Sequence, residues 1–327
     1  MPCIVFAGHA VLDHVFHVDD LAGGGGKGVA RDYHCRAGGL ALNAARAAHR
    51  LRGPASPAVR LLSACGDDAA GAMLQQAWRD ATAAVRPPPA RPGGAEGVLP
   101  HADGRHDAEA VFAVVPGART SVSAVLVDRR GERQLRNFRG DAFAHAPLPD
   151  SSSLDGAIGV QVDPRWPAAA RWALAQCRAR GLVSLLDAEV AETALLRELV
   201  PLADWVVFSA AGFEAWAGAG ARLDAAVAVD LPAGAQVVVT RGAEGAVWRE
   251  PGGRLRSLQA FDIDAHDTNG AGDALHGALL LSLAEGLPPA EALRRAMAAA
   301  ALACRGAPPT RAELDHFLHD SARRGPE

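Results

Sequence analysis

The chain has 327 residues, long enough for a substantial core, and its 49% hydrophobic content is typical of globular proteins. A formal net charge of −4 gives no electrostatic reason to expect a nucleic-acid partner. The five cysteines lack metal-site spacing and no apolar run is long enough to cross a bilayer, so we expect a cytoplasmic protein with reduced thiols and no membrane contact.

The N-terminal half contains extended segments on either side of a helix. Residues 11–36 and 119–139 have strand-like composition, and the second range alternates on both sides of the turn Asp128–Gly131, which predicts a hairpin. Residues 41–51 have helical composition. We expect the extended segments to form a small sheet of their own.

From about residue 154 onward, a short apolar strand, a polar residue at its end and a helix follow one another repeatedly. This alternation predicts an α/β fold with a largely parallel central sheet flanked by helices. Open α/β folds bind ligands at the carboxyl ends of their strands. The polar residues at these predicted ends are Asp163, Asp187, Ser209 and Thr240.

No linker divides the sequence, so we expect a single domain over residues 1–327. Within it, the small sheet would form a sub-domain from about 12–36 and 111–139. Residues 86–110 are rich in Pro, Gly and Ala, which predicts an exposed, mobile insertion.

The most informative motif is Asp267–Asp273, with the sequence Asp-Thr-Asn-Gly-Ala-Gly-Asp, which runs into a helix-like segment. Its small residues can turn the chain tightly into a helix start, where unpaired N–H groups bind a phosphate. Asp273, in the first turn, is placed to accept a proton from an attacking hydroxyl. A bare G-x-G-D is more often a helix entry with a stabilising acid, but the full string before a helix favours the chemical interpretation.

Other motifs give weaker signals. Gly38–Gly39 precede a helix that carries Asn43, whose amide could grip a sugar hydroxyl, although a turn with a buried asparagine explains the same pattern. Asp13 could accept hydrogen bonds from substrate hydroxyls. Thr240–Gly245 is a glycine-rich turn between strands, which suits a nucleotide or a simple hairpin equally well.

Lys27 is the only lysine of the chain and lies in the glycine run 23–28. The run opens no helix, so it is not a dinucleotide fingerprint, and Gly28 stands where a Walker A motif needs Ser or Thr. We interpret it as a flexible loop that carries a compact ammonium group.

Taken in this order, Asp13, Gly38–Gly39 with Asn43, Thr240–Gly245 and Asp267–Asp273 resemble the ribokinase-like (PfkB) carbohydrate kinase family over nearly the whole chain. The resemblance implies a ribokinase-like fold and in-line transfer of the ATP γ-phosphate to a sugar hydroxyl, with Mg²⁺ bridging the phosphates. It also implies that the small sheet is a lid through which two chains form a homodimer and, in many members, that a monovalent cation such as K⁺ is bound.

The resemblance assigns roles to individual residues. Asp273 would be the general base beside an anion hole formed by Gly270, Ala271 and Gly272. The residues expected to hold the sugar are Asp13, Gly38, Gly39 and Asn43. The residues expected near the nucleotide are Thr240, Gly242, Gly245 and Thr268. Asp264 would ligate the monovalent cation, and Asp187 would lie in the outer shell of Mg²⁺.

Within the family, the chain is most similar to ketohexokinase-like and sulfofructose-kinase-like members. In the sulfofructose kinases, a lysine, an asparagine and an arginine matching Lys27, Asn137 and Arg165 surround the sulfonate. A lysine and an arginine facing one pocket favour an anionic head group. The expected substrate is therefore a ketose such as fructose, or an anionic derivative such as sulfofructose.

One departure from the family pattern leaves other functions open. The N-x-x-E motif that many members use near Mg²⁺ is absent, with Ser209 and Gly212 at its two ends. The same loss occurs in the ketohexokinase-like branch. The alternatives are a nucleoside or sugar-phosphate kinase of the same fold, or a non-catalytic sugar- or nucleotide-binding regulator.

Overall fold

The structure is a computed structural model that describes residues 1–21, 27–83, 107–221, 223 and 234–324. Most of the predicted insertion at 86–110 lies outside these residues. Only its last four positions are described, and the edge strand β5 begins within them.

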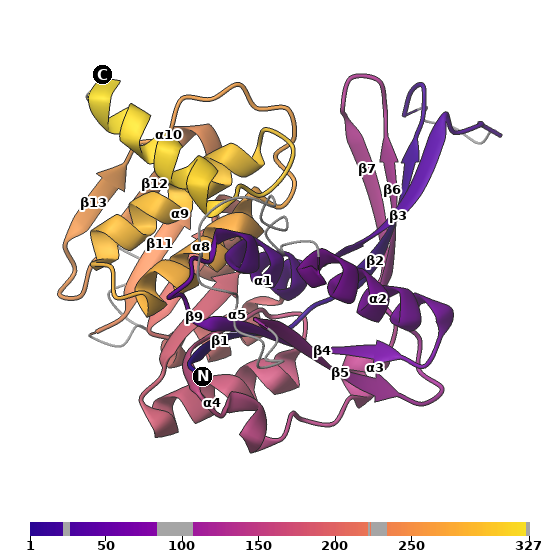
Figure 1. Ribbon diagram of the computed structural model, residues 1–327, viewed down its shortest axis with the longest axis horizontal. Helices are drawn as coiled ribbons and strands as arrows, with labels where there is room; N and C mark the ends of the chain where they lie inside the picture. Colours follow the sequence, from indigo (N-terminus) through magenta and orange to yellow (C-terminus); the bar gives the residue numbers. More distant parts are fainter. Residues whose placement is uncertain (22–26, 84–106, 222, 224–233, 325–327) are drawn as a thin grey trace, which may run out of the picture.

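A nine-stranded sheet forms the centre of the molecule (Figure 1). All strand pairs from β5 to β11 are parallel, and only β12 and β13 run antiparallel to their neighbours. This confirms the predicted α/β fold with a largely parallel sheet. In order across the sheet, the strands are β13 (Leu255–Leu258), β12 (Ala246–Arg249), β11 (Gln236–Thr240), β10 (Trp205–Ser209), β9 (Val183–Ala188), β8 (Ala157–Val162), β1 (Cys3–Ala7), β4 (Ala58–Gly66) and β5 (Ala108–Val115).

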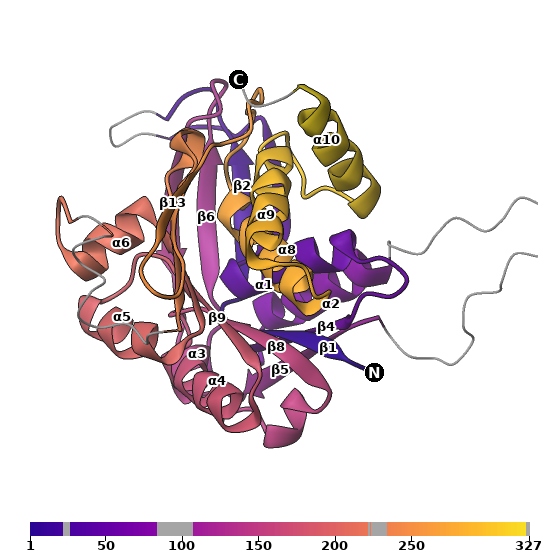
Figure 2. The same ribbon diagram turned by 90° about the vertical axis from the view of Figure 1, so that its left-hand side faces the viewer.

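Helices cover both faces of this sheet (Figures 1 and 2). Because successive side chains of a strand point to opposite faces, Ile4 and Phe6 of β1 pack into one apolar layer and Val5 and Ala7 into the other. The first layer includes α1 (Leu40–Leu51), α2 (Ala69–Ala83), α8 (Ala271–Ala284), α9 (Pro289–Ala303) and α10 (Arg311–Arg324). The second includes α4 (Pro167–Arg180), α5 (Thr193–Leu199) and α6 (Ala210–Ala217).

The other helical elements whose bounds the structure describes are short. They are α3 (Ala142–His145) and the 3₁₀ turns η1 (Ser151–Leu154), η2 (Val200–Leu202) and η3 (Gly242–Glu244). Among the described residues, no helix combines the length and apolar character that a bilayer span requires.

A four-stranded sheet stands at one end of the molecule (Figure 1). Its order is β3 (Asp32–Gly38), β2 (Val11–His17), β6 (Val122–Val127) and β7 (Arg133–Phe138). The antiparallel pair β6–β7 is the hairpin predicted around Asp128–Gly131. Residues 111–115, expected in the lid, belong instead to β5 of the large sheet, because β5 pairs in parallel with β4 along its whole length. The second segment of the small sheet therefore starts later in the chain than predicted, with β6 at Val122.

Helices α1 and α8 approach each other closely at Gly277. A Cβ atom at this position would lie 2.2 Å from the carbonyl oxygen of Ala44 in α1, so only glycine permits the observed spacing. The predicted helix at 41–51 is α1, and the motif Asp267–Asp273 leads into α8 as expected. The contact places the two motif-bearing helix starts side by side.

Candidate active site

Asp273 and Asn43 meet at the start of α8. The Nδ2 atom of Asn43 donates a hydrogen bond to Oδ2 of Asp273 at 2.8 Å, although the residues are 230 positions apart. Asp273 is the third residue of α8 and is only 8% exposed. Gly270 caps the helix in the left-handed conformation, with φ of 77°, which glycine adopts without strain. The two predicted motifs therefore converge on one carboxylate.

The first turn of α8 offers main-chain donors beside this carboxylate. Among the described residues, no partner accepts a hydrogen bond from the amides of Gly272 and Asp273, whereas the Ala271 amide donates to the Thr268 carbonyl at 3.3 Å. Unpaired amides at a helix start attract anions. They border a pocket of about 380 Å³ lined by Leu40, Arg133, Glu189, Thr268, Asn269, Gly270, Gly272 and Asp273.

The small sheet contacts this pocket through Arg133 of β7. Its guanidinium forms an ion pair with Asp267, with Nη2 and Oδ2 separated by 2.5 Å. Burial tends to raise the pKa of Asp267, but Arg133 and the Asn269 amide outweigh it and hold the pKa below its ordinary value. Arg133 was not predicted, because nothing in the sequence pairs a lid strand with the motif loop.

Three buried carboxyl groups gather at the carboxyl ends of β8 and β9. Burial raises the pKa of Asp273 to about 7, and repulsion from Asp163 and two further carboxylates adds to the effect. Burial also raises the pKa of Asp163 to about 6, although the amides of His9 and Arg165 stabilise its charge. Burial and then the Asp273 charge raise the pKa of Asp187 well above its ordinary value. Burial and mutual repulsion therefore disfavour the charged forms of all three carboxyl groups.

Glu189, one position after β9, belongs to this group and was not predicted. It lines the same pocket as Asp273, and its charge raises the pKa of both Asp187 and Asp273. The hydroxyl of Ser209 donates a hydrogen bond to Oε1 of Glu189 at 3.1 Å. Thus the residue that begins the missing N-x-x-E motif holds a carboxylate from the neighbouring strand. The available signal was the Asp-x-Glu spacing of Asp187 and Glu189 at a strand end.

His276 also lies beside the carboxylates, one helical turn after Asp273. Its Nδ1 is 3.4 Å from Oδ2 of Asp187, and burial lowers the pKa of His276 to about 4, so its ring is neutral near pH 7. Ligand atoms of Asp187, Asp273 and His276 lie within 4.8 Å of one another. Within the described part of the chain, Oδ2 of Asp187 is buried without a hydrogen-bond partner. The arrangement has the donor set and charge of a cation site.

Two predicted sugar residues lie on one face of the small sheet. Asp13 and Asn137 both pair with Ser123, from β2 and β7 respectively, so their side chains share that face. Asp13 is half-buried and forms an ion pair with Arg36, whose Nε is 3.5 Å from Oδ2. Burial raises the pKa of Asp13, and Arg36 opposes that change. Gly38 lies against the Asp13 carboxylate.

Cationic groups lie near the strand ends as well. Arg165 follows β8, and its charge lowers the pKa of Asp163, Asp187 and His9. The pKa of His9 falls to about 4, mainly through burial and then through Arg165 and Arg139. Arg139 was not predicted. The site thus combines buried carboxyl groups with two nearby guanidinium groups.

Several predicted residues lie apart from this centre. Lys27 and Asp264 are exposed, and in the described ranges no hydrogen bond or ion pair joins either of them to the site. Gly39, in contrast, caps α1 next to the pocket residue Leu40. Thr240 ends β11, and its hydroxyl donates to the Phe208 carbonyl at 3.1 Å. Gly242 and Gly245 form the turn between β11 and β12.

A larger pocket of about 1420 Å³ lies among residues 258–262, α9 and α10. It contains none of the predicted site residues. The carboxylate centre at α8 is therefore the candidate active site.

Comparison with known proteins identifies the family to which the chain belongs. A model of the pfkB family of carbohydrate kinases matches residues 1–87 and 109–311. A putative ribokinase from Agrobacterium tumefaciens is 27% identical, with 98% of this chain and 99% of that chain covered and a TM-score of 0.84. Ribokinase from Arabidopsis thaliana, complexed with ribose and ATP, is 21% identical over 97% and 98% of the two chains, with a TM-score of 0.74. A nucleoside kinase from Methanocaldococcus jannaschii is 15% identical over 98% and 99%, with a TM-score of 0.73. The last two similarities show the shared fold.

The raised pKa of Asp273 predicts a pH-dependent gain in stability for Asp273→Asn. A carboxyl with a folded pKa of about 7 and an ordinary value of 3.8 binds more protons when folded, so the free energy of unfolding decreases as pH rises between these values. Asparagine keeps an acceptor for Asn43 and removes the charge. The free energy of unfolding of Asp273→Asn should therefore rise relative to that of wild type from pH 4 to 7, by up to about 4 kcal/mol.

Urea unfolding at several pH values measures this difference. Glu291→Gln is the matched control, because Glu291 is an exposed acid in the first turn of α9. If the free energies of unfolding of wild type and Asp273→Asn change with pH in parallel, the pKa of the Asp273 carboxyl is not raised in the folded protein.

Proposed function

Because this chain belongs to the pfkB family of carbohydrate kinases and is therefore an ATP-dependent carbohydrate kinase, we propose that it phosphorylates a hydroxyl of a ketose or ketose-like sugar with Asp273 as the general base. The observation that carries the proposal is the Asp273 carboxylate, held by Asn43 beside the unpaired amides of Gly272 and Asp273.

In the proposed reaction, the substrate hydroxyl oxygen forms a bond to the γ-phosphorus of ATP while the bond to the β–γ bridging oxygen breaks. The hydroxyl proton passes to Asp273, and ADP leaves with the bridging oxygen. Gly270, Ala271 and Gly272 shape the anion hole, in which the free amides stabilise charge on the transferring phosphoryl group. A base with a pKa of about 7 is suited to accept this proton near neutral pH.

For the sugar, we assign Asp13, Gly38, Gly39 and Asn43 to hydroxyl recognition. The lid face that carries Asp13 also carries Asn137, and Arg165 lies at the strand ends below. The charges of Arg165 and Arg139 both lower the pKa of His9, which supports a positive region near the sugar. This favours an anionic ketose such as sulfofructose over neutral fructose, with Lys27 as the third cation.

For the nucleotide, we assign Thr240, Gly242, Gly245 and Thr268. The residues present fit Mg²⁺, because Asp187 has a buried oxygen without a partner and faces repulsion from neighbouring carboxylates. Asp187 and Glu189 would hold the water molecules that surround the ion. The bound Mg²⁺ would neutralise charge on the phosphates. Ser209 orients Glu189, so the missing N-x-x-E motif does not remove the metal's carboxylate support. This weakens the case for a non-catalytic regulator.

Two further assignments rest on the family resemblance. Asp264 would ligate K⁺, and the lid would join two chains as a homodimer. The exposed rings of Tyr33 and Phe138, 49% and 41% accessible, provide apolar surface on the lid for such a contact.

The division of roles between Asp273 and Glu189 can be tested by measuring turnover and Mg²⁺-dependent ADP binding in parallel. Asp273→Asn should lower kcat about 10²- to 10⁴-fold through loss of the base, while Mg²⁺–ADP affinity is retained. Glu189→Gln should instead weaken ADP binding about 10-fold in the presence of Mg²⁺ and leave Mg²⁺-free binding unchanged.

Glu291→Gln serves as the control in both assays and should match wild type. Near-normal turnover by Asp273→Asn on any accepted sugar would refute its role as the base. Equal nucleotide affinity of Glu189→Gln and wild type at every Mg²⁺ concentration would remove Glu189 from the metal's surroundings.

Substrate charge can be tested with a panel of neutral and anionic ketoses, followed by ADP release. Lys27→Ala should lower kcat/KM for the preferred anionic ketose about 10- to 100-fold, because a hydrogen bond to a charged group is lost. Its effect on neutral ketoses should stay below about 3-fold.

Arg136→Ala is the matched control, because Arg136 neighbours Asn137 on β7 but points to the opposite face of the lid. If Lys27→Ala changes neutral and anionic substrates equally, or if no anionic ketose is accepted, the anionic-substrate proposal fails while the kinase assignment remains.

A further inference from the structure

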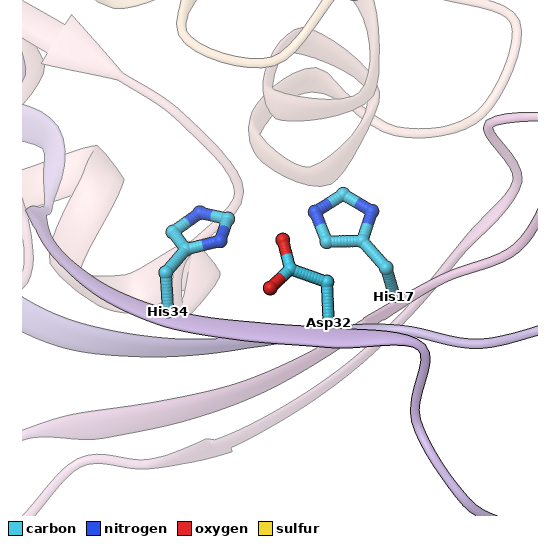
Figure 3. A group of neighbouring side chains, drawn as sticks. All are labelled: His17, Asp32 and His34. Carbon is cyan, nitrogen blue, oxygen red and sulfur yellow. The ribbon is translucent and has the colours of Figure 1, made fainter.

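The outer end of the lid carries two histidines and an aspartate that the proposed reaction does not use. His17 of β2 pairs directly with Asp32 of β3, and His34 lies two positions farther along β3. Because side chains of a strand alternate between faces, all three lie on the same face. Figure 3 shows them on the same side of the ribbon, with the Asp32 carboxylate between the two imidazole rings.

The three side chains converge closely enough to share one ion. One ligand atom from each of His17, Asp32 and His34 lies within 4.8 Å of the other two. The two imidazole rings are stacked, with centroids 5.6 Å apart and planes inclined by 27°. His17 is half-buried, whereas Asp32 and His34 are exposed, so the group is open to solvent.

Asp32 is already oriented by its own strand. Its Oδ1 accepts a hydrogen bond from the Tyr33 amide at 2.8 Å, which leaves Oδ2 available for a ligand. A hydrogen bond to one oxygen of a ligating carboxylate is a common feature of metal sites, because it fixes the direction of the other oxygen.

We propose that His17, Asp32 and His34 bind a divalent transition metal ion of the Zn²⁺ type on the lid. Two imidazoles and one carboxylate are the ligands that Zn²⁺ accepts, whereas Mg²⁺ and Ca²⁺ prefer oxygen ligands alone. Tetrahedral metal–ligand distances of about 2.0–2.2 Å place ligand atoms about 3.3–3.6 Å from one another. The side chains therefore need to close by at most about 1.5 Å, with water in the remaining position.

The position of the site predicts its structural effect. His17 ends β2 and Asp32 begins β3, so a bound ion joins the two strands at the end of their antiparallel ladder where the chain passes from one strand to the other. The same face carries Asp13 four residues earlier on β2. Metal binding therefore stabilises the lid strand to which the proposed sugar residue belongs, without any ligand from the carboxylate centre at α8.

The test uses the full-length chain without a polyhistidine tag, stripped of metal and titrated with Co²⁺ or Zn²⁺ by calorimetry and visible absorption. His17→Ala/His34→Ala is the main variant, and His145→Ala is the control because His145 is exposed in α3, away from the lid. All three proteins keep Asp187, Asp273 and His276, so binding at that cluster is common to them.

Wild type and His145→Ala should bind one more ion per chain than the double variant. Loss of the two imidazoles should weaken that binding at least about 10- to 100-fold. Equal stoichiometry and affinity in wild type and the double variant would overturn the proposal and leave the group as an ordinary ion-pair cluster.

Hydrogen exchange of wild type alone provides a second measurement that does not depend on folding of the variant. Zn²⁺ should slow amide exchange at the paired ends of β2 and β3 and leave β6–β7 less affected. Protection confined to α8 and β9, with none in β2–β3, would also overturn the lid site.

Discussion

The close contact between α1 and α8 is the constraint on which the rest of the site depends. Gly277 allows the Ala44 carbonyl to approach where any Cβ atom would collide. At this spacing, Asn43 reaches the Asp273 carboxylate, and the unpaired amides of the first turn of α8 face the same pocket. A wider separation of the helices would remove the hydrogen bond and move the anion-binding amides away from the strand ends. The chemistry therefore depends on how small residues pack.

Buried carboxyl groups repel one another where the start of α8 lies beside the carboxyl ends of β8 and β9. Asp163, Asp187 and Asp273 are all largely buried, and the pKa of each is raised. Proteins retain such arrangements at functional sites, where a ligand supplies the missing opposite charge. In the proposed reaction, the nucleotide's metal ion and the transferred proton would each relieve part of this repulsion. Substrate binding would thus raise the free energy of unfolding.

The sequence predicted the parts of the structure that local pattern determines. The motif Asp267–Asp273, the helix at 41–51, the hairpin around Asp128–Gly131 and the largely parallel sheet all follow from spacing and composition, and the structure contains each of them. Local pattern could not reveal Glu189 or Arg133, because their importance comes from neighbours on other elements: Ser209 across the sheet and Asp267 across the pocket. The predicted start of the second lid segment was also wrong. An alternating pattern predicts a strand but does not indicate which sheet the strand joins, and β5 belongs to the large sheet because it pairs with β4.

The pH dependence of kcat/KM in wild type and Asn43→Ala tests the central claim most directly, because it reports the pKa of the free enzyme's base. For wild type, we expect kcat/KM to fall below a pH of about 7 as Asp273 becomes protonated. The hydrogen bond from Asn43 lowers the pKa of Asp273, so Asn43→Ala should move the same fall to higher pH. An acidic limb at the same pH in both proteins would contradict the account, because the titrating base would then not be the carboxylate that Asn43 holds.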